Sequence, residues 1–191
     1  MNRMVHIPLD FDVVSWASWA ENSNLPRELI SFTARFPEMF NSSAHSETFD
    51  DIIKPEATPR TMEYLAHLYK PGMDPEMLSI IAKGLIGKTP AEAFIKHLSA
   101  SDNPVSADEI LQGRFQEKLQ AHISNNRDDL VEASQTLLIS YLSKYDVGSA
   151  DSVFPNIVTY TQMLGADRGS HFLLELRNHA PEWYEPVAKH F

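Results

Sequence analysis

The chain has 191 residues and a formal net charge of −10, with 16 lysines and arginines against 26 aspartates and glutamates. It contains no cysteine, which excludes a disulfide framework and thiolate zinc sites, and its basic residues form no cluster that would suit a nucleic acid or an anionic membrane. No apolar run approaches the roughly 18 residues of a membrane span, and residues 1–12 lack the apolar core of a signal peptide. We therefore expect a soluble, cytoplasmic protein with no nucleic-acid or membrane partner.

Helical spacing of apolar residues dominates the first hundred residues. Asp12 is a predicted N-cap, and the polar segment 41–57 is a predicted loop. The predicted helices cover 11–24, 26–36, the stretch from Thr58-Pro59 to Lys70, that from Asp74-Pro75 to Gly87, and that from Thr89-Pro90 to Leu98.

The same periodicity continues to the C-terminus after a polar, turn-rich boundary at 99–105. Helices are predicted over 106–111, 114–124, 127–144, 150–164, 167–178 and 181–190, with Asn125 or Asn126 capping the third. The only strand-like segment is Met4–Leu9. The prediction is an all-α helical bundle of about ten helices, in two sub-bundles that meet near the boundary.

Residues 82–89, AKGLIGKT, match the permissive pattern of a phosphate-binding loop. Such a loop works only between a buried strand and a helix, yet the preceding residues keep helical spacing from Asp74-Pro75 onward. No apolar strand ending in acidic residues follows to hold magnesium. We interpret Gly87-Lys88-Thr89 as a helix C-cap followed by an N-cap, with Lys88 in solvent.

Few other residues depart from an ordinary helical protein. Arg60 places a cation in the first turn of a predicted helix, against the helix dipole, and is either an anion-binding residue or a solvated partner of Glu63 or Glu56. The eight histidines follow no metal-binding pattern, and His67 and His97 are expected at surface or boundary positions. Core packing is the preferred interpretation for the three tryptophans, Trp16, Trp19 and Trp183.

Read in chain order, several short motifs resemble one family. They are Asn2-Arg3 before a strand, the helix around Trp16-Ala17, the Phe32-x-x-x-x-Pro37 helix end, the Thr58-Pro59-Arg60-Thr61 helix start, and the Gly84-x-x-Gly87 turn before Ala91-x-x-Phe94. Together they resemble the C-terminal part of bacterial MoxR-like AAA+ ATPases, which work with von Willebrand factor A-like partner proteins. The match covers about residues 2–100, and Ala107–Phe191 resembles the helical extension of the family more loosely.

The resemblance implies a domain layout and two functional residues. Residues 1–10 would be a remnant of the last core strand, 11–100 a lid-like helical domain, and 104–191 the C-terminal helical extension. Arg60 would be the sensor-2 arginine, which reaches the γ-phosphate of ATP and so also binds the cofactor. Arg3 would be the arginine finger that reaches the nucleotide of a neighbouring subunit. No metal-binding residue is implied.

The sequence lacks the α/β core domain that the family resemblance leads us to expect. No α/β core precedes Asn2, so the isolated chain is expected to bind no cofactor and to be inactive, while a full-length parent would use ATP and Mg²⁺. The leading hypothesis is a lid and helical region that contacts an AAA+ core domain, neighbouring subunits or a von Willebrand factor A-like protein. The alternatives are a free-standing helical protein-protein interaction module and a degenerate nucleotide binder that uses Gly87-Lys88-Thr89.

Overall fold

A computed structural model describes residues 11–40, 55–100, 102–145 and 152–191. Within these ranges the chain forms ten α-helices, one short 3-10 helix and no strand, which confirms the all-α prediction. Arg3 and the strand predicted at Met4–Leu9 lie outside the described residues.

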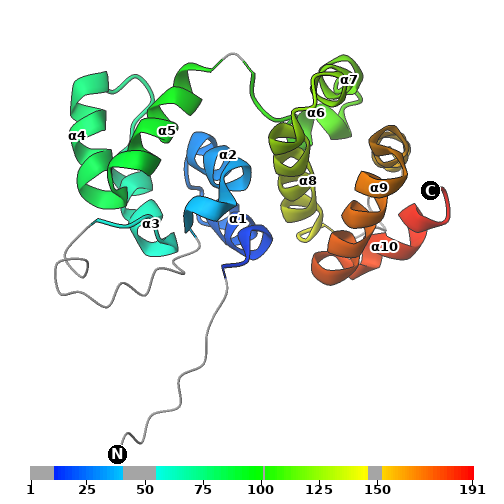
Figure 1. Ribbon diagram of the computed structural model, residues 1–191. Coiled ribbons are helices and arrows are strands. Elements are labelled where there is room, and N and C mark those ends of the chain that lie inside the picture. The colour runs from blue at the N-terminus through cyan, green and yellow to red at the C-terminus, as the bar shows by residue number, and fades with distance from the viewer. Residues whose placement is uncertain (1–10, 41–54, 101, 146–151) are drawn as a thin grey trace, which may run out of the picture.

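The helices divide into two groups at a linker, of which the structure describes residues 100 and 102–106 (Figure 1). The first bundle comprises α1 (Val13–Asn22), α2 (Arg27–Arg35), η1 (Pro37–Phe40), α3 (Pro59–Leu68), α4 (Pro75–Ile86) and α5 (Lys88–Ser99). The second bundle comprises α6 (Ala107–Leu111), α7 (Gln116–Ser124), α8 (Asp128–Leu142), α9 (Phe154–His179) and α10 (Pro181–Ala188).

Capping chemistry fixes several helix starts where the sequence predicts them. The Asp12 side chain accepts hydrogen bonds from the backbone N–H groups of Val14 and Ser15, and Asp74 accepts one from Met77. Thr58 and Thr61 form a reciprocal capping box at the start of α3. These side chains replace the hydrogen-bond partners that the first turn of a helix lacks.

Two predicted caps are wrong. Gly87, with φ +83°, is both the C-cap of α4 and the N-cap of α5, so Thr89 lies inside α5 rather than capping it. Asn125 is the C-cap of α7, and Asn126 has a positive φ of 52° as the chain turns toward α8. The asparagines therefore close α7, and Arg127 takes the N-cap position of α8 without a side-chain bond.

The two helices predicted over 150–164 and 167–178 correspond to the two halves of α9, which meet at a break. Gly165 has a φ of +76° and a ψ of 176°, which is not helical, and its neighbours continue the helix on both sides. Glycine suits this conformation because it has no Cβ to clash. The predicted helical periodicity is thus present, and the break falls between the two predicted segments.

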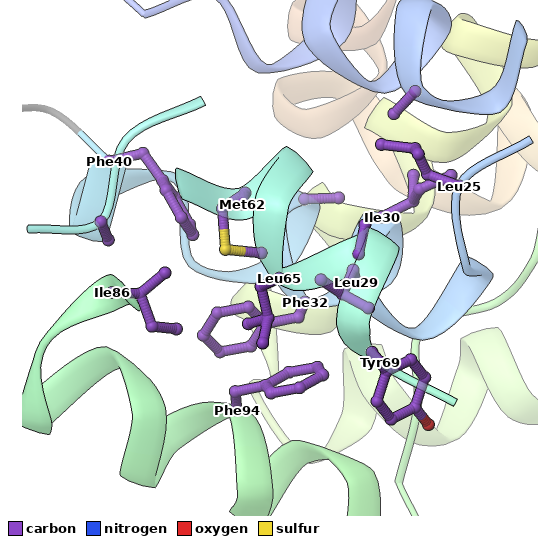
Figure 2. Packing of buried hydrophobic residues seen from close by; sticks show 14 of the residues in the cluster. Leu25, Leu29, Ile30, Phe32, Phe40, Met62, Leu65, Tyr69, Ile86 and Phe94 are labelled. Atoms are coloured by element: carbon purple, nitrogen blue, oxygen red, sulfur yellow. The ribbon is translucent and has the colours of Figure 1, made fainter. Parts of the chain in front are cut away.

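Aromatic residues fill the core of the first bundle. Phe32 lies at the centre, with the ring of Phe94 at 5.2 Å and that of Phe40 at 6.0 Å between centroids. Tyr69 packs on the other side of Phe94 at 5.8 Å. Figure 2 shows the rings of Phe40, Phe32 and Phe94 clustered with Met62 and Leu65 of α3, and the ring of Tyr69 at the edge of the cluster. Burial of such side chains contributes about 1.5–3 kcal/mol each.

A second core lies among α6–α10, and α8 belongs to both. Leu137 of α8 packs in the first core, while Leu138 and Leu142 pack in the second. Figure 1 shows α1 and α2 between α8 and the α3–α5 group, and the bundles meet where α1 and α2 contact α8. One helix thus joins the two apolar cores.

The tryptophan prediction holds for two of three residues. Trp16 and Trp183 are buried, and Trp183 donates a hydrogen bond from Nε1 to the Tyr145 carbonyl at 2.9 Å. Trp19 is 41% exposed, because it lies beside Trp16 at the rim of the first core rather than within it. Among the helices described, none is both long enough and apolar enough to cross a membrane.

Candidate functional site

Arg60 is the second residue of α3, and its side chain is exposed. The capping box of Thr58 and Thr61 fixes the first turn of the helix. The Thr61 hydroxyl also donates a hydrogen bond to the Glu56 carbonyl at 2.9 Å, which ties this turn to the preceding residues. Arg60 forms no ion pair with a carboxylate of the described residues; Glu63 instead lies 3.8 Å from His67. The alternative in which Arg60 is a partner of Glu63 or Glu56 therefore finds no support in the described contacts.

Arg60 begins an exposed row along α3. Tyr64 and Leu68 follow at intervals of four residues and are 52% and 50% exposed. Residues four apart lie on one helix face, so these three side chains form a continuous row, here called the α3 stripe. The opposite face carries Met62 and Leu65, which are fully buried in the first core.

The Gly84–Thr89 segment joins two helices. Residues 84–86 belong to the end of α4 and α5 begins at Lys88, so the strand that a phosphate-binding loop requires is absent here. A Cβ on Gly87 would lie 2.6 Å from the Pro55 carbonyl oxygen, which explains the glycine through backbone packing. Lys88 is exposed, as predicted.

A hollow, here called the inter-bundle cleft, lies between the two bundles beside the linker. It has a volume of about 630 Å³, and its walls come from α2, the end of α5, the linker with α6, and the C-terminal part of α8. Leu25, Ile30 and Leu137 supply apolar surface, and Tyr141 and Tyr145 stack at 4.5 Å. No local sequence motif predicts this cleft, because its residues come from distant parts of the sequence.

Ion pairs surround the inter-bundle cleft. Arg27 pairs with Asp108 at 2.8 Å, Lys118 with Glu109 at 3.1 Å, and Lys144 with Glu21 at 2.5 Å. The first and third pairs join the two bundles across the cleft. The stacked neighbour Tyr145 raises the pKa of Tyr141 to about 12 through its side-chain hydrogen bond, with burial adding to the effect.

His97 of α5 also lines the cleft, and of the two positions predicted for it, surface or boundary, the surface position is wrong. It is only 5% exposed, and the rings of Phe32 and Phe36 lie 5.8 Å and 6.4 Å from it. Burial, together with the nearby charge of Arg35, lowers the pKa of His97 to about 4. The imidazole is therefore neutral at pH 7, and its Nδ1 has no hydrogen-bond partner. His67 is exposed, as predicted.

A network of four side chains holds the linker between the bundles. Arg127 bonds Asp102 of the linker and contacts Asp129 of α8 at 2.9 Å. Arg35 of α2 reaches the same Asp129 at 3.0 Å. Hydrogen bonds from Arg127 lower the pKa values of Asp102 and Asp129. The network fixes the linker against both bundles.

Metal chemistry finds no support in the described part of the chain, where no three histidine or carboxylate side chains gather as ligands. Comparison with family models, with curated proteins and with solved structures finds no match. The functional interpretation therefore starts from Arg60, the α3 stripe and the inter-bundle cleft.

Proposed function

We propose that the chain is the lid and C-terminal helical region of a MoxR-like AAA+ ATPase and is not catalytic by itself. The observation that carries the proposal is the position of Arg60, exposed in the first turn of a firmly capped helix. In the parent protein an α/β core would hold ATP and Mg²⁺. Arg60 would reach the γ-phosphate as the sensor-2 residue, and Arg3 would serve a neighbouring subunit as the arginine finger.

The chemistry expected of Arg60 follows from its guanidinium group. As ATP is hydrolysed, negative charge develops on the transferred phosphoryl group, and a fixed cation stabilises that charge more than it stabilises bound ATP. The capping box supports this role, because it fixes the helical turn from which Arg60 projects. Tyr64 and Leu68 of the α3 stripe offer apolar surface for contact with a core domain.

Hydrolysis by the isolated chain is not expected. Positioning of the phosphates and charge neutralisation by Mg²⁺ supply most of the catalysis in such enzymes. The segment around Lys88 joins two helices and offers no phosphate-binding loop. Purified chain should release no phosphate from Mg·ATP. Turnover that Lys88→Ala abolishes and Lys83→Ala leaves intact would instead support the degenerate nucleotide binder.

A domain graft tests the proposal. The chain replaces the lid and C-terminal helices of a MoxR-like ATPase, and the matched control is the same core without any lid. If the proposal holds, the graft hydrolyses ATP at a rate well above that of the core alone. A graft that folds, by circular dichroism, and yet adds nothing to the core's turnover contradicts the proposal.

A second candidate function is that of a helical interaction module without nucleotide chemistry. The inter-bundle cleft favours it, because a hollow of about 630 Å³ lined by apolar, tyrosine and charged side chains is of the size that ligands occupy. A von Willebrand factor A-like protein is the partner that the family resemblance suggests, and it would suit either function. In this second case the graft stays inactive and the chain binds a protein partner by itself.

A further inference from the structure

We propose that the inter-bundle cleft binds a short, basic, amphipathic peptide segment of a partner protein. The proposal rests on the shape, apolar surface and charge of the cleft. It does not depend on the lid assignment, so the two proposals fail separately.

The apolar part of the cleft suits aliphatic side chains. Leu25, Ile30 and Leu137 line the cleft, and their exposed fractions are 7%, 2% and 9%. At one end Tyr145 is 45% exposed and stacks on Tyr141 with only 17° between the ring planes. A flat tyrosine pair of this kind accepts an aliphatic chain or a cation on its face.

The charge of the cleft favours a cationic ligand. Four carboxylates line it against three cations, and each cation is already paired with a carboxylate. Glu28 of α2 forms no ion pair with a cation of the described residues. His97 adds no positive charge at pH 7, because burial holds its pKa at about 4. One carboxylate is thus left to pair with a basic residue of the ligand.

The same charges disfavour an anionic ligand. A phosphate or a nucleotide would have to take Arg27, Lys118 or Lys144 from its carboxylate partner. The net charge of −10 opposes the approach of any anion and favours that of a basic segment. An amphipathic segment that lies between helices, with apolar anchors inward and its charge at the rim, fits both properties of the cleft.

Designed peptides test the proposal directly. The probe is a fluorescein-labelled Leu/Lys peptide of about twelve residues with amphipathic helical spacing. Its matched controls carry Glu in place of Lys or Ser in place of Leu, and binding is followed by fluorescence anisotropy at about 0.15 M salt. The Leu/Lys peptide should bind at least about tenfold more tightly than either control. Equal binding of the Leu/Glu peptide, or no binding of the Leu/Lys peptide, overturns the proposal.

Three variants locate the binding site. Glu28→Lys should weaken binding of the Leu/Lys peptide about tenfold, since it puts a like charge beside the ligand. Tyr145→Ala should weaken it several-fold. The control is Glu132→Lys, which changes the net charge equally at an exposed position of α8 that lines a different hollow. Circular dichroism confirms folding of each variant. If Glu132→Lys weakens binding as much as Glu28→Lys, overall charge explains the binding and the proposal is wrong.

Discussion

The two bundles differ in how completely they cover their apolar side chains. The outer helices of the first bundle, α3 and α4, expose Tyr64, Leu68, Met77 and Ile80, and Ile80 is 74% exposed. Among its described residues, the second bundle has three large exposed apolar side chains, and these are scattered: one follows α8, one lies on α9 and one is at the C-terminus. Exposed apolar residues that gather on neighbouring helices indicate contact with another protein surface, whereas single ones are ordinary.

The difference concerns the outer surface of the first bundle and not its core. Phe32 is fully buried, as are Tyr160 and Phe172 in the second bundle. The bundles are also joined, because α8 contributes side chains to both cores. We therefore interpret the molecule as one cooperative unit in which α3 and α4 expose apolar side chains.

The largest expected effect tests whether the bundles form one unit. Phe32→Ala removes the central ring of the first core and should lower the free energy of unfolding by about 3–5 kcal/mol. Because α8 is shared, hydrogen exchange should show the same loss of protection in α9 as in α2. Urea unfolding measures the loss in the free energy of unfolding of the whole chain. Protection of α9 that stays at its wild-type level would show instead that the bundles unfold independently.

Acid should weaken the first core through His97. The imidazole has a pKa of about 4 in the folded chain and about 6.5 when unfolded, so the unfolded state binds more protons between these values. The free energy of unfolding should therefore fall by about 3 kcal/mol as the pH drops from 6.5 to 4. Urea midpoints of the wild type and of His97→Leu at several pH values measure this.

The control for that series is His171→Leu, at an exposed position on α9. It should keep the wild-type pH profile, whereas His97→Leu should flatten it. A His97→Leu profile as steep as that of the wild type would show that other groups cause the acid sensitivity.

Two glycines of the Gly84–Thr89 segment should respond to alanine with opposite signs. Gly87→Ala combines a positive φ with a clash against the Pro55 carbonyl, and should cost about 1–3 kcal/mol. Gly84 lies inside α4, and a Cβ there would have nothing within 4 Å, so Gly84→Ala should raise the free energy of unfolding by about 0.8 kcal/mol. Thermal unfolding compares the pair. Equal effects at the two positions would contradict the described turn.

The smallest expected effect concerns the linker between the bundles. Arg127→Ala removes the cation that lowers the pKa values of Asp102 and Asp129, and at pH 7 should cost less than about 1 kcal/mol because the pairs are partly exposed. Carboxylates with lowered pKa values stabilise the folded state above their ordinary range and lose this effect as they are protonated. The difference from the wild type should vanish below about pH 3. If urea unfolding still shows a stability difference between Arg127→Ala and the wild type below about pH 3, Arg127 stabilises the chain through packing and not through charge.

Local chemistry explains what the sequence predicted well. The caps at Asp12, Thr58 and Asp74 depend on residues within a few positions, and each helix start is where the pattern places it. His97 and Trp19 were misplaced because their environment comes from packing with other helices. Arg60 is exposed, and its role in an ATPase stays a prediction.

The inter-bundle cleft could not be predicted, because no short pattern contains it. Glu28 and Tyr141 both line the cleft and are more than a hundred residues apart in the chain. Their relation depends on how α2 packs against α8, which is a property of the whole fold. Periodicity identifies the faces of single helices but not which helices meet.

The central claim is that Arg60 acts on ATP within a parent ATPase, and the grafted enzyme measures it directly. The measurement is the turnover number and the ATP affinity of Arg60→Ala and Arg60→Lys, beside Arg114→Ala as a control at an exposed arginine of the second bundle. We predict that Arg60→Ala lowers turnover by at least about tenfold with little change in affinity, that lysine rescues only in part, and that Arg114→Ala has no effect. Unchanged turnover in Arg60→Ala would contradict the account.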